Sequence, residues 1–107
     1  MQAVNRGKRT ANCNDVELRR MIGPDKHRPG LARARLVAEQ IPVWAIIGYI
    51  GAVVGTTDPT AITNEAIAQV AADYDISHEA VQAALLYYGE HRAVIDALLE
   101  ANEAALA

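Results

Sequence analysis

The residues that could do chemistry are few and lie far apart along the 107-residue chain. The only serine, Ser77, directly precedes an apolar stretch of helical periodicity, where its hydroxyl is suited to cap the helix. Asp73 and Asp75 are close in sequence, but carboxylates at a helix end usually face solvent. One cysteine, Cys13, allows neither a disulfide nor a paired-cysteine metal site, and the three histidines form no His-x3-His pair. The sequence therefore predicts neither an enzyme nor a metal or cofactor site.

The charges divide the chain into a basic and an acidic part. Residues 1–40 contain nine of the ten Lys and Arg residues and four acidic residues, which leaves a net charge of +5. Residues 41–107 contain only Arg92 against nine acidic residues, a net charge of −8. A basic arm of this kind is typical of contact with nucleic acid or with an acidic surface, although the same charges would also solvate a disordered terminus.

Composition changes again near residue 30. In residues 1–30 Gly, Asn, Pro and charged residues dominate, which predicts a disordered basic arm with one short amphipathic turn around Leu18. Residues 31–107 are expected to form the folded domain, and the weak alternation of residues 31–37 is compatible with a short strand. No apolar leader of a secretory signal is present at the start, so the cytoplasm is the expected compartment.

Four apolar segments follow, and their periodicity predicts an all-α, four-helix domain. The first, residues 43–54, is uncharged and follows Pro42, a favoured residue in a first helical turn. At roughly 1.5 Å per residue it is too short for a bilayer core of about 30 Å, so we expect a buried helix and no membrane span. The other predicted helices cover residues 65–74, 78–88 and 91–106, with Gly89 ending or kinking the third.

The second and third of these helices have the spacing of a helix-turn-helix pair. Ala71 is small where the helices must approach, Ile76 is placed to fill the turn, and Val81 packs the second helix back on the first. The turn usually requires Gly for a positive φ, and Asp75 stands there instead, a residue that tolerates this conformation better than most. We therefore predict two helices joined by a tight turn.

Such a pair could read DNA through the outward residues of its second helix. Those are expected to be Ser77, His78, Glu79, Gln82 and Ala83, with Leu86 at the margin. None of them is Lys or Arg, so phosphate contacts, which supply most of the affinity, would have to come from the arm. The residues predicted to contact DNA are Arg28, Arg33, Arg35, Ser77, His78 and Gln82.

The last helix offers a second kind of surface. Acidic residues alternate there with leucines, a pattern that suits binding of a protein partner or contact across a two-fold dimer. The inner part of the same stripe is expected to close the core. The residues predicted to bind a partner are Asp96, Leu99, Glu100, Glu103 and Leu106.

Two stretches of the chain resemble the DUF433 family of small bacterial and archaeal proteins. The first is Ile41-Pro-Val-Trp at the start of a helix. The second is the run Val81-Gln-Ala-Ala-Leu-Leu-Tyr-Tyr-x-Glu-His, followed by the pair Ile95-Asp96. The resemblance covers about residues 30–100 and implies a homeodomain-like helix-turn-helix fold. The chain departs from it at residues 38–40, Ala-Glu-Gln in place of Gly-Thr-Arg, and in a longer loop from Gly55 to Thr63.

The resemblance also implies a function: an antitoxin of a type II toxin–antitoxin system that neutralises a PIN-like ribonuclease by direct binding. We expect a cytoplasmic homodimer that binds the toxin protein and also contacts operator DNA. The alternative is a stand-alone helix-turn-helix transcriptional regulator without a toxin. A third interpretation is a structural dimer module with other partners.

Overall fold

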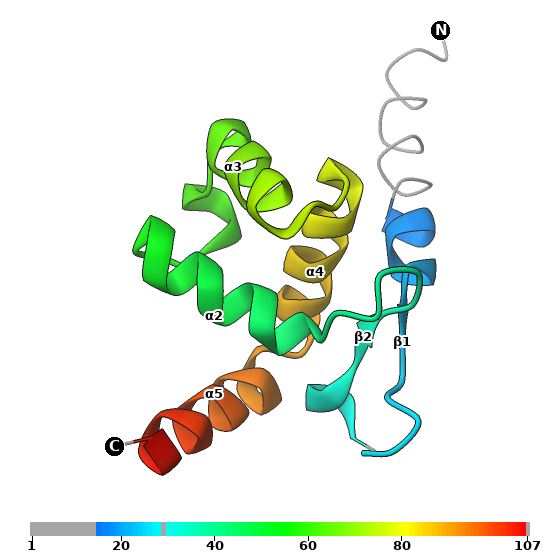
Figure 1. Cartoon of the computed structure of the whole chain (residues 1–107), viewed down its shortest axis with the longest axis vertical. Coiled ribbons are helices and arrows are strands. Elements are labelled where there is room, and N and C mark those ends of the chain that lie inside the picture. The colour runs from blue at the N-terminus through cyan, green and yellow to red at the C-terminus, as the bar shows by residue number, and fades with distance from the viewer. Residues whose placement is uncertain (1–14, 29, 107) are drawn as a thin grey trace, which may run out of the picture.

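Helices make up most of the part of the chain that the computed structural model describes, residues 15–28 and 30–106. A small two-stranded sheet lies at one side of the helices (Figure 1). In chain order the named elements are β1 (Ile22–Gly23), the 3-10 helix η1 (Leu31–Arg33), β2 (Arg35–Leu36), α2 (Val43–Val54), the 3-10 helix η2 (Pro59–Ala61), α3 (Asn64–Tyr74), α4 (His78–Glu90) and α5 (Arg92–Leu106).

The ends of the helices follow local sequence features. Pro42 precedes α2, and Gly55 ends it with φ 91°, a left-handed conformation that Gly adopts without steric cost. The Thr63 hydroxyl accepts a hydrogen bond from the backbone N–H of Ala66, which caps α3. The Ser77 hydroxyl accepts one from the N–H of Ala80 and caps α4 in the same way. We expected Gly89 to end or kink the third predicted helix. Instead Gly89 lies on the exposed side of α4, and the helix continues to Glu90.

The predicted tight turn joins α3 to α4. Asp75 adopts φ 58° and ψ 49°, the left-handed conformation that the turn requires. The N–H of Ile76 donates to the carbonyl of Ala71 at 2.9 Å, which closes the end of α3 in the manner of a Schellman motif. Ala71 and Val81 are buried, and Ile76 packs against the core. The spacing that predicted this turn is therefore confirmed.

Helix α4 lies at the centre of the core. It contacts α2, α3, α5 and β1, and its buried residues occupy more than half of its circumference. Ala83, which we expected to face outward, is 1% exposed. The rest of the core comes mainly from α2, whose buried residues are Val43, Ile46, Ile47 and Ile50.

Tyrosines fasten α2 to α3. The hydroxyl of Tyr49 donates to the carboxylate of Asp73, and this bond together with desolvation raises the pKa of Tyr49. Tyr74 packs edge-on against Tyr49 with the ring centroids 5.3 Å apart, and its hydroxyl donates to the carbonyl of Ala45. Asp73 therefore has an internal partner as well as a position at the helix end.

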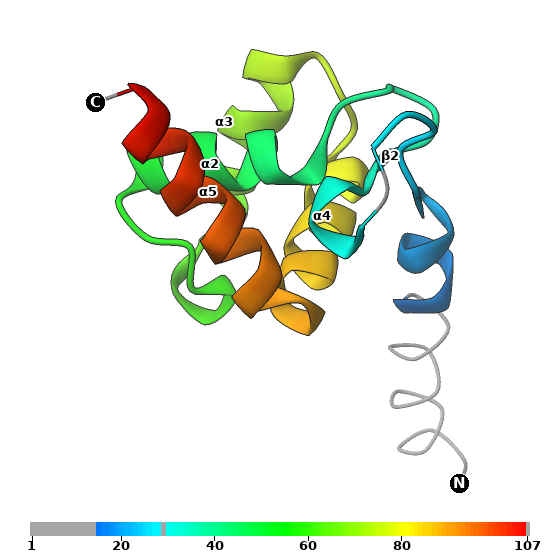
Figure 2. The same ribbon diagram turned by 90° about the horizontal axis from the view of Figure 1, so that it is seen from below.

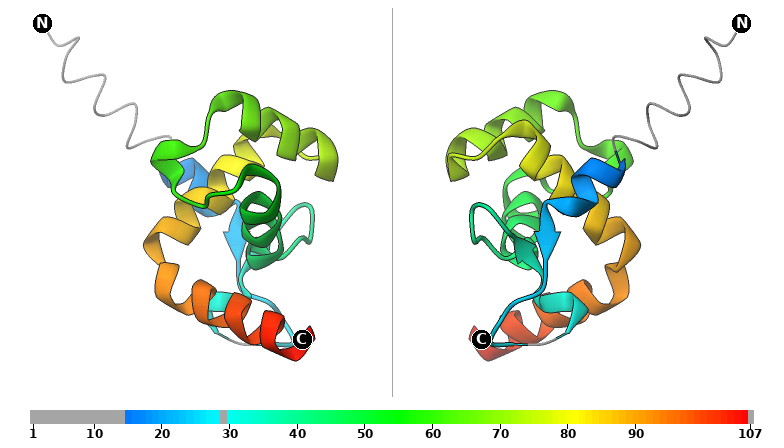
Figure 3. Two further views of the ribbon diagram at one scale, coloured as in Figure 1. Left: turned by 90° about the vertical axis from the view of Figure 1, so that its left-hand side faces the viewer. Right: turned by 90° about the vertical axis from the view of Figure 1, so that its right-hand side faces the viewer.

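The described part of the predicted disordered arm is folded, which corrects that prediction for residues 15–28. Residues 15–20 are helical, and β1 pairs with β2 so that Ile22 faces Leu36. Leu18 is 8% exposed and belongs to the core cluster. Figure 3 shows residues 15–20 beside α4. Burial of this one leucine, together with strand pairing, holds a charged segment on the domain. The arm's residues 1–14 lie outside the described part.

The expected strand at residues 31–37 is also shorter than predicted. Only Arg35 and Leu36 form it, since the chain first makes the 3-10 turn of η1. Among the described residues, no helix has the length and apolar character needed to cross a membrane.

Candidate functional site

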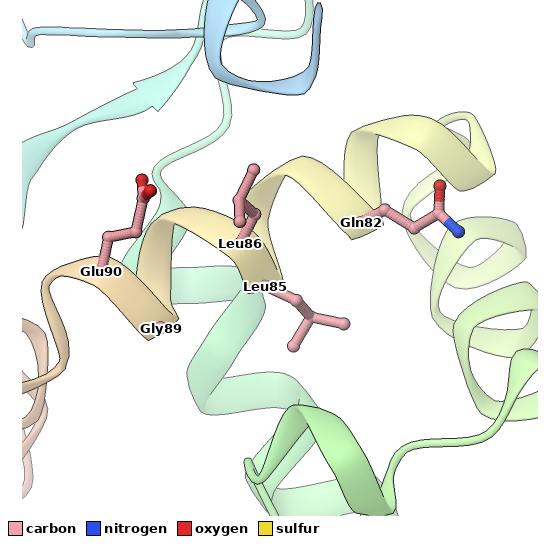
Figure 4. Close-up of a pocket in the computed structure, with 5 residues that line it drawn as sticks. All are labelled: Gln82, Leu85, Leu86, Gly89 and Glu90. Atoms are coloured by element: carbon pink, nitrogen blue, oxygen red, sulfur yellow. The ribbon is translucent and has the colours of Figure 1, made fainter. Parts of the chain in front are cut away.

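The outward strip of α4, which we define as Glu79, Gln82, Leu86, Gly89 and Glu90, is the surface that a DNA-reading helix would present. Figure 4 shows four of these residues together with Leu85 around a shallow hollow of about 300 Å³. The lining is almost wholly apolar and contains no Lys or Arg. The strip therefore lacks the positive charge that phosphate contacts need.

The C-terminal half of this strip already has a partner within the chain. In Figure 4, Leu86 and Glu90 point toward the helical residues 15–20. The Nε of Arg19 donates to Oε2 of Glu90 at 3.0 Å, and this hydrogen bond lowers the pKa of Glu90. Leu86 is partly buried and packs against the core. The exposed residues of α4 are His78 and Glu79 in its first turn and Gly89 and Glu90 at its end.

The predicted DNA-contacting residues do not form one surface. Ser77 is engaged as the α4 cap, and the exposed His78 and half-buried Gln82 follow it at the start of the helix. Arg33 is the last residue of η1, which contacts α5. The Tyr87 hydroxyl donates a hydrogen bond of 2.6 Å to the carbonyl of Leu31 at the start of η1. Arg33 thus lies toward the opposite end of α4 from Ser77 (Figure 1).

The other two arginines belong to the loop between the strands and to β2. Asp25 accepts hydrogen bonds from the backbone N–H groups of His27 and Arg28, and these lower its pKa. The Nε of Arg35 lies 4.0 Å from Oδ2 of the same carboxylate, and the Arg35 side chain is only 27% exposed. Arg35 is therefore held against the loop, and only Arg28 of this pair is fully exposed.

A larger hollow, the α2–α5 groove, lies between α2 and α5, which contact each other. In Figure 2, α5 crosses in front of α2. Its volume is about 560 Å³. Three of the predicted partner-binding residues, Asp96, Leu99 and Glu100, line it from α5. Helix α2 contributes Trp44, Ile47, Gly48, Gly51 and Ala52, with Thr57 and Asn102 at the ends.

Small residues of α2 make this groove. A Cβ atom at Gly48 would lie 3.3 Å from Cδ2 of Leu99, and one at Gly51 would lie 3.3 Å from Cγ2 of Thr57. Both contacts are tighter than ordinary packing, so glycine is needed for α5 and the following loop to approach. Leu99 and Thr57 therefore pack directly on these two positions, and the exposed Ala52 leaves the neighbouring part of the groove without a large side chain.

One acidic residue of the groove is fixed in place by the core. The Tyr88 hydroxyl donates to Oδ1 of Asp96 at 2.7 Å and lies 3.2 Å from the Thr57 hydroxyl. Tyr88 is 3% exposed, and burial raises its pKa. The guanidinium of Arg92 lies 5.3 Å from the Tyr88 ring centroid, in cation–π geometry.

The sequence identified the α5 side of the groove but not the α2 side. Trp44, Gly48 and Gly51 belong to the helix that we expect to be buried, and Trp44 also belongs to the motif that resembles the DUF433 family. Neither expectation predicts a groove there. Glu103 and Leu106 fall in the last turn of α5, where the side chains lie outside the described part of the structure.

Among residues 15–28 and 30–106, no cluster of three or more His, Cys, Asp or Glu residues has metal-binding geometry. The chain is also without a match in three comparisons: no known protein family, no curated protein sequence and no solved structure is significantly similar to it.

Proposed function

We propose that this protein is a binding module that holds a protein partner in the α2–α5 groove, as an antitoxin of the type II kind holds its ribonuclease. The observation that carries the proposal is the groove itself, an open apolar channel with acidic residues along one wall. The motifs that resemble the DUF433 family would imply the same function, with a homeodomain-like fold and a PIN-like toxin as the partner.

The charge of the chain suits a nuclease as the partner. A ribonuclease must attract a polyanion, so the surface around its active site carries positive charge. Residues 41–107 of this chain carry a net charge of −8, and Asp96 and Glu100 bring part of that charge into the groove. A nuclease bound there would have its substrate surface neutralised and covered at once.

Co-expression with the product of the adjacent open reading frame tests this proposal. The groove is blocked with Ala52→Phe, and Ala68→Phe provides a matched control, because both alanines are exposed on helices and only Ala52 lines the groove. We expect wild type and Ala68→Phe to co-purify with the neighbour and to suppress its RNA cleavage, and Ala52→Phe to do neither. Equal co-purification by all three proteins would place the partner elsewhere.

A second candidate function is DNA binding by a helix-turn-helix regulator, and the geometry of the α3–α4 pair favours it. It would act as a homodimer on the protein's own promoter, with the basic residues before residue 40 supplying the phosphate contacts. Binding to a labelled promoter fragment should then fall steeply with salt, and Arg28→Gln should weaken it and reduce the salt slope by about one. Binding that is independent of sequence and of Arg28 would argue against this candidate.

A further inference from the structure

We infer that the occupant of the α2–α5 groove is a basic amphipathic helix of the partner. Its apolar side chains would sit beside Trp44 and against Leu99, which covers Gly48, and its lysines or arginines would pair with Asp96 and Glu100. This inference rests on the proposed function and specifies the chemistry of the surface that the partner must offer.

The shape of the groove is that of a site for a helix. The α2 residues that line it, from Trp44 to Ala52, recur at intervals of three, one, three and one, which places them on one face over about two helical turns. From α5, Asp96, Leu99 and Glu100 share a face over little more than one turn. A groove that one helix lines over about two turns and a second over about one fits the apolar face of a third helix.

The floor of the groove determines which side chains fit. The side chains of Leu99 and Thr57 already cover Gly48 and Gly51, since each lies 3.3 Å from where the glycine's Cβ atom would be. An apolar side chain of the incoming helix would therefore contact Trp44, Ala52 and Leu99, which line the groove. Residues at i and i+3 or i+4 of the partner would therefore supply the apolar contacts.

The charges of the groove determine the sign of the flanking residues. Asp96 and Glu100 are four residues apart on α5 and so share a face. Among the described residues no Lys or Arg lines the groove, and the guanidinium of Arg92, four residues before Asp96, is placed over the Tyr88 ring. An acidic helix would bring like charges together, whereas a basic helix would find two carboxylates at a matching interval.

Trp44 makes the inference measurable, because it is the only tryptophan of the chain and lies in the groove. The full-length protein is titrated with two designed helical peptides that have identical leucines at i, i+3 and i+4. One carries Lys at the flanking positions and the other carries Glu. We expect the Lys peptide to shift Trp44 emission saturably and the Glu peptide to leave it unchanged up to millimolar concentration.

Three variants identify the contacts. D96N/E100Q removes both charges while Asn retains an oxygen for the Tyr88 hydroxyl, and it should weaken binding of the Lys peptide about tenfold. Glu65→Gln/Glu79→Gln removes two exposed acidic charges outside the groove and should bind as wild type does. Ala52→Phe should abolish the emission shift. Failure of the Lys peptide to bind, or equal binding of both peptides, overturns the inference.

Co-purification with the adjacent gene product separates this inference from the proposed function. If Ala52→Phe abolishes co-purification but D96N/E100Q retains the partner with unchanged affinity, the groove holds a partner that is not basic. In that case the proposed function stands and the inference fails. If Ala52→Phe itself retains the partner, the groove is not the docking site and both fail.

Discussion

The outward strip of α4 and the α2–α5 groove both combine apolar side chains with acidic ones. Only the α4 strip has partners for such side chains within the described part of the chain. On α4, Glu90 is paired with Arg19, and Leu86 faces residues 15–20. In the groove, Asp96 is oriented by Tyr88 but has no cation among the lining residues. The difference indicates that the α4 pair serves as a scaffold, while the groove is the surface left for a partner.

Replacement of Leu18 gives the largest expected effect, because it removes the anchor of the segment that covers α4. Leu18→Ala should lower the free energy of unfolding by about 2 kcal/mol, near the lower end for buried leucines, since the site borders solvent. Val16→Ala, at a position 44% exposed, is the control and should change stability by less than about 0.5 kcal/mol. Urea unfolding measures both. If Leu18→Ala and wild type are equally stable, Leu18 does not anchor residues 15–20 on α4. The outward strip of α4 would then be as available to a partner as the groove.

A smaller effect is expected at the turn of the helix pair. Asp75→Gly should stabilise the protein by about 0.5 kcal/mol, because Gly adopts the left-handed conformation without the Cβ clash. The same residue introduced at the exposed helical position Ala72 should destabilise it by about 1 kcal/mol. Thermal unfolding distinguishes the two variants. If α3 and α4 are only a scaffold, Asp75→Gly leaves binding in the groove unchanged. Weaker binding would mean that the helix pair also contributes to the binding surface.

The smallest effect concerns the ion pair that closes the α4 strip. Arg19 lowers the pKa of Glu90 in the folded protein, so the pair contributes stability above the unfolded carboxyl pKa of about 4.3. That contribution is lost as the pH falls through the lower folded pKa. The urea midpoint of Glu90→Gln should therefore lie slightly below wild type at pH 7 and meet it near pH 3. A cycle with Arg19→Gln isolates the pair, and a difference that persists at pH 3 would refute this account.

The helices and the turn of the α3–α4 pair could be predicted from the sequence because their determinants are local. Pro42 and Gly55 bound α2, Ser77 caps α4, and Asp75 occupies the position of the α3–α4 turn that needs a positive φ. Each of these acts over three to five residues. Periodicity then identifies the buried faces, although Ala83 shows its limit, since an alanine fits an inward face as well as an outward one.

The packing of residues 15–20 on α4 and the α2–α5 groove could not be predicted in full, because both join segments distant in sequence. Arg19 and Glu90 are 71 residues apart, and the two walls of the groove, near Gly48 and Leu99, are about 50 apart. The amphipathic turn around Leu18 can be recognised locally, but its sequence does not indicate that this leucine enters the core of a domain that begins later. The acidic and leucine pattern of α5 pointed to one wall, but only the packing of α2 completes the site.

The separation of charge along the chain also has a kinetic consequence. The basic strand hairpin and the acidic helices occupy different sides of the molecule (Figure 1), so the protein has a permanent dipole moment. In the field of a positively charged partner it would rotate before contact, with α5 and the groove leading and the hairpin trailing. Such orientation raises the rate of productive encounters and fades as ionic strength shortens the reach of the field. A segment that never touches the partner would in this way influence how fast the complex forms.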